Sequence, residues 1–184
     1  TALRYAAFNV TSIVTSTGFV STDYLLWGPF AATAFVVFAL TGGCTGSTSG
    51  SIKIFRWQVV FAQLKRAFIT TTEPNRMVPL KIGHSNISAQ VAGSIFIFLT
   101  AFSLSTIVLT LSIALTGIDF TTAFSGVVAC LSNSGPGISQ LIGPSGNYSS
   151  LPETAKWLLA FTMLLGRLEV MTILVIFTKS FWRQ

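Results

Sequence analysis

The segment Thr41–Ser51 constrains the fold of this chain most strongly, because it cannot form a regular helix although its flanks are typical of membrane-buried sequence. It consists of small residues, four of them glycine, and it lies in a run without formal charge from Tyr24 to Ile52. Each glycine costs roughly 1 kcal/mol in a helix interior relative to alanine, and the hydroxyl side chains compete for backbone hydrogen bonds. We therefore expect a membrane helix that runs from Tyr24 through Leu40 and breaks at this segment.

An unwound segment at membrane depth must lie against protein or a water-filled passage, because lipid cannot satisfy its N–H and C=O groups. The segment Thr41–Ser51 is therefore predicted to face a pathway. A flexible linker between two domains is the alternative, and the apolar stretch Phe30–Leu40 in front of the segment argues against it.

The composition excludes an ordinary soluble domain. Of the 184 residues, 51% are hydrophobic and 9% are charged, whereas a soluble domain carries roughly 25% charged residues. The chain begins with Thr and no secretory leader opens it, so we expect a piece of a longer protein. Cys44 and Cys130 are expected to be small buried residues that form no disulfide.

The charge distribution predicts a topology. Basic residues gather in the stretch that follows the broken helix, and this pattern favours a cytoplasmic linker over a nucleic-acid-binding surface. The residues are Lys53, Arg56, Lys65, Arg66, Arg76 and Lys81, set against Glu73. Within this stretch, Phe55–Phe68 is typical of an amphipathic helix at the membrane surface. His84 is the single histidine and has no carboxylate or thiol nearby, so we interpret it as a linker residue.

The other apolar stretches differ in length. Thr1–Val14 is too short to cross a hydrocarbon core of roughly 30 Å. It is either a re-entrant helix or an ordinary helix that the fragment boundary truncates. Val91–Leu115 is long enough to span the membrane with some tilt, and Gly117 with Asp119 should mark the outer surface. The last helix is predicted to begin at Leu151-Pro152-Glu153, with a proline and an acid in its first turn, and to run over Trp157–Phe177.

Two parts of the chain share one pattern, which indicates an internal repeat. A short apolar helix leads into a hydroxyl-rich turn with a glycine, and another helix follows. The turns are Thr15–Phe19 and Leu131–Gly137, and Gly18 is set over Gly135. Repeated units of this kind are common in membrane transporters.

Arg167 lies near the midpoint of the last predicted helix. An arginine at that depth costs at least about 2.5 kcal/mol, so it requires a partner or a purpose. Glu169 stands at i+2, on another side of the helix. The bare carbonyls of Thr41–Ser51 are predicted at a comparable depth and suit a guanidinium donor. A purely structural pairing with Glu169 or another helix is the alternative.

Four motifs in this order resemble the TrkH and KtrB superfamily of potassium-translocating membrane subunits: Thr15–Phe19, Gly42–Thr48, Asn133–Gly137 and Leu165–Glu169. The resemblance covers essentially the whole chain but only the carboxyl-terminal part of the family pattern. It implies an all-α integral membrane protein with potassium-channel-like repeats of helix, re-entrant pore loop and helix, in which one broken helix carries an intramembrane loop.

Three regions follow from this resemblance. Residues 1–57 correspond to the third repeat from its pore helix onward, including the filter loop and the broken second helix. Residues 58–87 form the cytoplasmic basic linker, and residues 88–184 form the complete fourth repeat.

The resemblance also implies the site residues. Carbonyl groups of two turns would replace the hydration shell of K⁺ as half of a selectivity filter. These filter residues are Thr15, Ser16, Thr17, Gly18, Leu131, Ser132, Asn133, Ser134 and Gly135. The intramembrane loop, with Arg167 projecting against it, would form a gate. The loop residues of this gate are Gly42, Gly43, Cys44, Thr45, Gly46, Ser47, Thr48 and Ser49.

The implied function is gated potassium uptake across the bacterial inner membrane by a multi-pass protein in contact with membrane lipid. The implied partners are a second copy in a homodimer and a cytosolic nucleotide-binding ring similar to TrkA or KtrA, with no nucleic acid. No cofactor is expected other than K⁺ as the transported ion. Two turns cannot close a fourfold filter, so we do not expect the chain to conduct alone.

Two other functions stay open at this point. In a secondary transporter, the broken helix would bind a small anionic solute and Arg167 would hold its negative group. In a membrane anchor, the glycine-rich segment would only pack against another helix. An enzyme is not expected, because no pairing of base and nucleophile can be drawn and no Gly-Lys-Ser or Gly-Lys-Thr completes a phosphate-binding loop.

Overall fold

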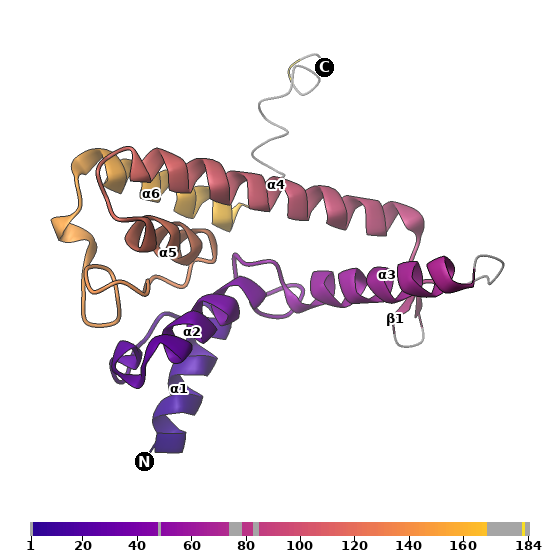
Figure 1. Cartoon of the computed structure of the whole chain (residues 1–184), viewed down its shortest axis with the longest axis horizontal. Coiled ribbons are helices and arrows are strands. Elements are labelled where there is room, and N and C mark those ends of the chain that lie inside the picture. Colours follow the sequence, from indigo (N-terminus) through magenta and orange to yellow (C-terminus); the bar gives the residue numbers. More distant parts are fainter. Residues whose placement is uncertain (1, 48, 74–78, 83–84, 169–181, 183–184) are drawn as a thin grey trace.

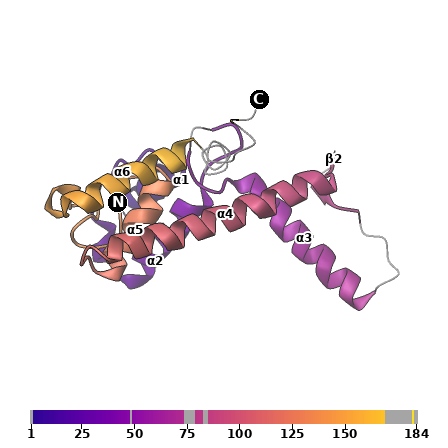
Figure 2. The ribbon, with the colours of Figure 1, turned by 90° about the horizontal axis from the view of Figure 1, so that it is seen from above.

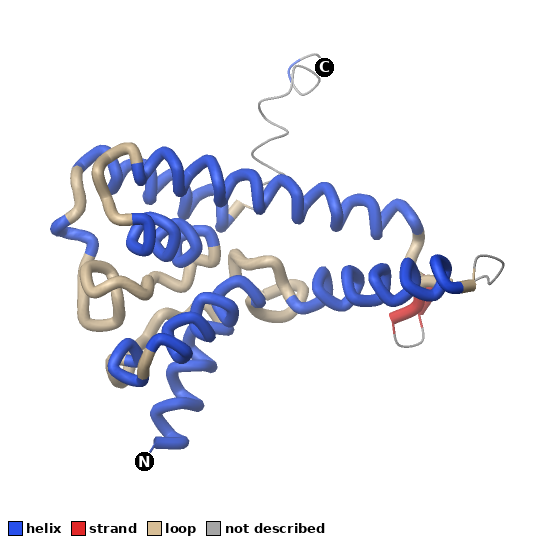
Figure 3. Tube along the Cα trace, in the orientation of Figure 1, coloured by secondary structure: helices blue, strands red, loops and turns tan. Residues whose placement is uncertain are grey.

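The computed structural model describes residues 2–47, 49–73, 79–82, 85–168 and 182, and the regular structure in these ranges is almost entirely helical (Figures 1 and 3). One short antiparallel hairpin, β1 with β2, is the exception. The elements are α1 (Ala2–Val14), the 3₁₀ helix η1 (Tyr24–Trp27), α2 (Pro29–Thr41), α3 (Ile54–Thr72), β1 (Lys81–Ile82), β2 (Ser85–Asn86), α4 (Ala89–Ala114), α5 (Phe120–Leu131), the 3₁₀ helix η2 (Tyr148–Ser150) and α6 (Glu153–Arg167).

Helices α4, α5 and α6 pack against one another, and α5 lies beneath the other two in Figure 1. Their shared core is apolar and includes Phe102, Ile113, Val127 and Leu159. Helix α5 is buried along most of its length, so it can be short and still be held firmly. This bundle fixes the position of the turn that follows α5.

Helices α1 and α2 pack against each other, and α2 also contacts α5. Ile13, Phe35 and Val128 form the core between them. On the other side, α3 extends beside the far half of α4 and diverges from it when seen from above (Figure 2). Helix α5 therefore links the amino-terminal pair of helices to the rest of the described chain.

The helix starts follow local capping chemistry. The Asp119 carboxylate accepts from the backbone N–H of Thr121 at 3.1 Å at the start of α5, and the Ser88 hydroxyl accepts from Val91 at 3.3 Å at the start of α4. Side chains of this kind satisfy N–H groups that a helix start leaves without partners. The caps fix where α4 and α5 begin.

Helix α4 is the one helix among the described residues that is both long and apolar enough to cross a membrane, with 26 residues. Only 28% of its most apolar stretch is buried in this chain, unlike the core helix of a soluble protein, which is mostly buried. Helices α2 and α5 are apolar but shorter. The predicted span Val91–Leu115 agrees with α4 to within a few residues.

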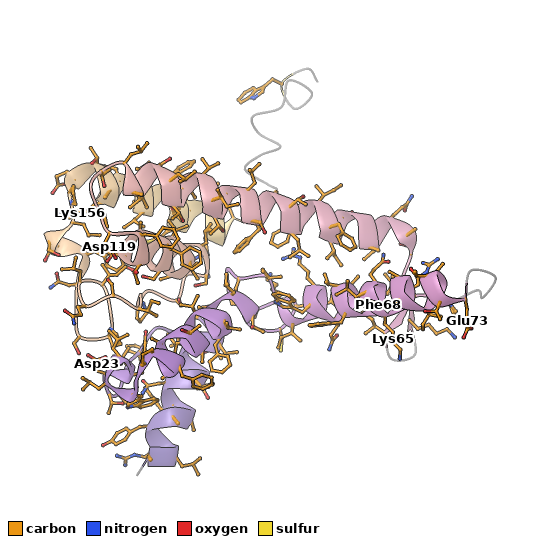
Figure 4. All side chains as sticks on the ribbon, viewed as in Figure 1. Asp23, Lys65, Phe68, Glu73, Asp119 and Lys156 are labelled. Atoms are coloured by element: carbon orange, nitrogen blue, oxygen red, sulfur yellow. The ribbon has the colours of Figure 1, made fainter. Side chains whose placement is uncertain are left out.

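Charged side chains lie at both ends of the long axis of the molecule (Figure 4). Asp23, Asp119 and Lys156 lie at one end, and Lys65 and Glu73 lie at the far end of α3. The prediction that Asp119 and the basic linker face opposite sides of a membrane requires this separation.

One predicted helix start was wrong. The helix expected from Tyr24 begins at Pro29, because Gly28 takes φ 100° and a residue before proline disfavours helical angles. The last helix begins at Glu153, as the Leu151-Pro152-Glu153 signal predicted, with Pro152 as its N-cap. Its predicted continuation to Phe177, with Glu169, lies outside the described residues, as does His84.

The region boundary predicted after residue 57 lies within α3. The expectation for the two cysteines was correct for one of them. Cys130 is buried as expected, whereas Cys44 is exposed at the tip of the loop that follows α2.

Candidate functional site

Two turns carry most of the predicted site residues, and their backbones have the same conformation. We call residues 15–18 the first turn and residues 132–135 the second turn. Ser16 and Asn133 take φ 56° and 54°, and Gly18 and Gly135 take φ 79° and 92°. A residue other than glycine in this region costs roughly 1–2 kcal/mol. Residues with left-handed backbone angles recur at equivalent positions, so the two turns are built in the same way.

The hydrogen bonds of the two turns also correspond. The N–H of Thr17 donates to the Ser12 carbonyl at 2.8 Å, and the N–H of Ser134 donates to the Ala129 carbonyl at 3.0 Å. Each turn thus folds its N–H groups back onto the end of the short helix before it. These bonds satisfy helix-end carbonyls that would otherwise have no partner.

A pair of hydroxyl groups closes each turn. The hydroxyls of Thr15 and Thr17 are hydrogen-bonded at 2.7 Å, and those of Ser132 and Ser134 at 2.9 Å. The backbone carbonyls of residues 15–18 and 132–134 accept no hydrogen bond from any residue that the structure describes. The two turns therefore present a row of carbonyl oxygens that are available to a ligand.

The first and second turns meet at Gly18. A Cβ atom on Gly18 would lie well inside contact distance of the Ser134 carbonyl oxygen. Glycine is therefore required here for space as well as for its φ angle. A cavity of about 390 Å³ adjoins both turns and is lined in part by Gly18, Phe19, Gly135, Pro136 and Tyr148.

Two tyrosines hydrogen-bond to the second turn and to the residue two positions after it. The Tyr148 hydroxyl donates to the Gly135 carbonyl at 2.6 Å, and the Tyr24 hydroxyl donates to the Gly137 carbonyl at 3.2 Å. Burial, and to a lesser extent the neighbouring Cys130, raises the pKa of Tyr148, so this phenol stays a donor at neutral pH. Neither tyrosine could be predicted from the sequence, because both reach this region from distant segments.

The helix breaks where the sequence predicted. Helix α2 ends at Thr41, and the described residues 42–47 and 49–53 lie in the loop before α3, which we call the α2–α3 loop. The loop is closed at its base, where the N–H of Ile52 donates to the Leu40 carbonyl at 3.3 Å and that of Ile54 donates to Gly43 at 3.2 Å. Its tip, residues 44–47, is exposed in this chain. The predicted gate residue Thr48 lies outside the described residues.

Polar side chains shape the inside of this loop. The Ser49 hydroxyl accepts from the N–H of Gly43 at 3.2 Å and is hydrogen-bonded to Ser47 at 2.9 Å. Ser49 is buried. These bonds hold the loop as a compact unit although it contains no helix.

The α2–α3 loop reaches the end of α6. A Cβ atom on Gly50 would lie 3.1 Å from the carbonyl oxygen of Gly166, which precedes Arg167. Arg167 is the last residue of α6 and its side chain is exposed within this chain. The structure thus brings the loop next to the helix end that carries Arg167. A direct role of Arg167 at the gate stays a prediction.

The arrangement has close counterparts among known proteins. The crystal structure of the potassium transporter TrkH from Vibrio parahaemolyticus superposes with a TM-score of 0.89 and 34% sequence identity, over 97% of this chain and 38% of that one. The Trk system potassium uptake protein TrkI of Halomonas elongata is 42% identical over 184 residues, which is 100% of this chain and 37% of that protein. TrkH of Salmonella typhimurium is 38% identical over 184 residues, or 38% of its length.

The helical fold is therefore that of a membrane transporter. The profile of the cation transport protein family TrkH matches residues 1–183, and this chain belongs to that family. The chain spans somewhat more than a third of the length of the relatives named above.

Proposed function

We propose that this chain is part of a subunit that takes up potassium ions across the bacterial inner membrane through a gated pore. The first and second turns would supply half of a carbonyl-lined selectivity filter, and the α2–α3 loop would form the gate. The relatives above are named for potassium uptake. None of these names refers to an organic anion, so nothing in the comparisons supports the solute-transporter alternative.

The open carbonyls of the two turns carry this proposal. A dehydrated cation needs a set of oxygen ligands that replaces its water shell, and carbonyls already engaged in hydrogen bonds serve this purpose poorly. The turns keep the carbonyls of residues 15–18 and 132–134 free of hydrogen bonds from the rest of the described chain, while N–H groups and hydroxyls hold the backbone in place. We interpret α1 and α5, whose ends carry these turns, as pore helices of two repeats.

The α2–α3 loop suits a gate because it is polar, its described residues are not helical, and it approaches the second turn closely at Gly50, where a Cβ atom would lie 2.5 Å from Asn133 Nδ2. The same atom would lie 3.1 Å from the carbonyl oxygen of Gly166, the residue before Arg167. A positive charge near a low-dielectric passage repels a cation, and this repulsion would help to keep the passage shut. Opening would then require the loop to move.

The assembly is also part of the proposal. Two turns are too few for a fourfold filter, so the remaining half would come from the rest of the parent protein. A homodimer and a cytosolic nucleotide-binding ring similar to TrkA would complete the system. The exposed basic residues of α3, Lys65 and Arg66, are a plausible contact for that ring.

The proposal is tested with a pair of matched substitutions in the full-length parent protein, reconstituted in liposomes. Gly135 and Gly28 take φ 92° and 100°, and a Cβ atom at either one would meet nothing within 4 Å. Alanine therefore imposes a similar backbone strain at both positions, but only Gly135 belongs to the proposed filter. We expect Gly135→Ala to reduce potassium uptake or its preference over sodium, and Gly28→Ala to keep both. Absence of potassium uptake by the wild type, or equal effects of the two variants, would contradict the proposal.

A further inference from the structure

Three segments that are distant in sequence meet at one point, which we call the glycine junction: Gly50 of the α2–α3 loop, Gly166 of α6, and Leu131 with Asn133 around the second turn. A Cβ atom on Gly50 would lie 2.5 Å from Asn133 Nδ2, 2.8 Å from the Leu131 carbonyl oxygen and 3.1 Å from the Gly166 carbonyl oxygen. A Cβ atom on Gly166 would lie 2.7 Å from the same Asn133 Nδ2 and against the same Leu131 carbonyl.

Space, and not backbone conformation, requires glycine at positions 50 and 166. Neither residue has a positive φ, in contrast to Gly18 and Gly135. The atoms that a side chain would strike are mainly backbone carbonyls, and these cannot move without moving the helix ends that carry them. Any side chain at Gly50 must therefore push the loop away from the second turn and from α6.

Asn133 connects this contact to the second turn. Its backbone takes φ 54° as part of the turn, while its side-chain amide lies at the glycine junction and donates to the Leu131 carbonyl at 3.5 Å. The equivalent residue of the first turn, Ser16, has a shorter side chain whose buried hydroxyl has no hydrogen-bond partner among the described residues. The two turns are thus alike in backbone but differ at this side chain.

From this geometry we infer that Asn133 is a positioning residue through which the α2–α3 loop controls the shape of the second turn. With the loop in place, Gly50 and Gly166 confine the Asn133 amide and the Leu131 carbonyl, and so hold the adjoining carbonyls of residues 132–134. When the loop leaves, this confinement is lost and the turn relaxes. Loop position therefore sets ion selectivity as well as ion flow. The inference rests on the proposed function, because it assigns a second effect to the same gate.

The test compares the potassium-to-sodium uptake ratio of the full-length protein in liposomes with that of three variants. Gly50→Ala displaces the loop, and Asn133→Gly removes the amide while it keeps a residue suited to positive φ. Gly93→Ala is the control, because Gly93 lies in α4 with nothing within 4 Å of a Cβ atom. We expect Gly50→Ala to raise total cation uptake and to lower the ratio about fivefold or more, as a coupling between two sites commonly does. We expect Asn133→Gly to lower the ratio and Gly93→Ala to leave it unchanged.

The double variant Gly50→Ala with Asn133→Gly separates one shared contact from two independent effects. If the two residues act through the glycine junction, the double variant should lose little more selectivity than the more impaired single variant. Two results would overturn the inference and leave the gate itself intact. One is higher uptake in Gly50→Ala at an unchanged potassium-to-sodium ratio. The other is a double variant in which the ratio losses of the two single variants multiply. If Gly50→Ala fails to fold, a normal ratio in Asn133→Gly is sufficient to overturn it. Absence of potassium uptake by the wild type would overturn the proposed function as well.

Discussion

The hydroxyl of Tyr148 donates to the carbonyl of Gly135 at 2.6 Å, so a side chain from the loop before α6 holds the last residue of the second turn. A carbonyl oxygen has two lone pairs, and this bond occupies one of them. Gly135 therefore offers less to a cation than the carbonyls of residues 132–134, and its main role is to anchor the turn.

Replacement of Tyr148 by phenylalanine should loosen the second turn. We expect a loss of about 1 kcal/mol in the free energy of unfolding, the usual net worth of one hydrogen bond, together with a lower potassium-to-sodium uptake ratio. Tyr5→Phe is the control, because Tyr5 lies in α1 near Arg4 and away from the turn. Denaturant unfolding in detergent and uptake in liposomes provide the two measurements. Equal ratios in both variants would show that Tyr148 does not support the turn.

Alanine should be tolerated less well at Gly18 than at Gly135. Both residues have positive φ, but a Cβ atom on Gly18 would also collide with the Ser134 carbonyl, whereas Gly135 has open space. Overpacking of this kind typically costs roughly 1–3 kcal/mol beyond the backbone strain. Unfolding of the two purified variants side by side measures the difference. Equal stabilities would mean that the first and second turns do not touch in the assembled protein.

The guanidinium of Arg56 lies 3.7 Å from the centre of the Phe98 ring, and this cation–π contact helps to pack α3 against α4. We expect Arg56→Lys to lower stability by about 1 kcal/mol, because a lysine ammonium cannot stack as a planar group and the contact is partly desolvated. Arg66→Lys, at an exposed position of the same helix, should have no measurable effect. Thermal unfolding distinguishes the two, and an equal midpoint for both variants would exclude a stabilising contact.

Loss of the positive charge at Arg167 should favour ion entry. If Arg167 opposes cations at the gate, Arg167→Ala in the full-length protein should increase potassium uptake, and Arg167→Lys should keep most of the restriction. Arg66→Ala serves as a control for a general loss of charge. If the uptake rate and the gating response do not change in Arg167→Ala, Arg167 is not part of the gate.

Local chemistry determined which features could be predicted from the sequence. The glycines and hydroxyls of Thr41–Ser51 cannot continue a helix, and the structure breaks there. Gly18 and Gly135 occupy positions in the two turns that require left-handed backbone angles, which glycine adopts without strain. The start of α2 at Pro29 follows from the Gly28-Pro29 pair, because proline at the first helical position is a stronger local signal than the apolar run from Tyr24.

Long-range contacts could not be predicted. Tyr148 of η2 and Tyr24 of η1 hydrogen-bond to Gly135 and Gly137, and no spacing in the sequence indicates that they converge there. The same holds for Gly50 and Gly166, whose close approach depends on how α5 and α6 pack. Gly166 and Gly50 resemble ordinary small residues until the structure places the Leu131 carbonyl against both of them.

Potassium uptake by the full-length parent protein in liposomes, with and without residues 43–48 of the α2–α3 loop, tests the proposed gate most directly. We expect faster uptake when these residues are deleted, because the gate is then removed while the closing contact between Leu40 and Ile52 remains. Excess unlabelled potassium outside the liposomes should compete with the labelled potassium whose uptake is measured, in both proteins, and excess choline should not. Uptake that is unchanged or absent after the deletion, in a protein that still folds, would contradict a gate at this loop.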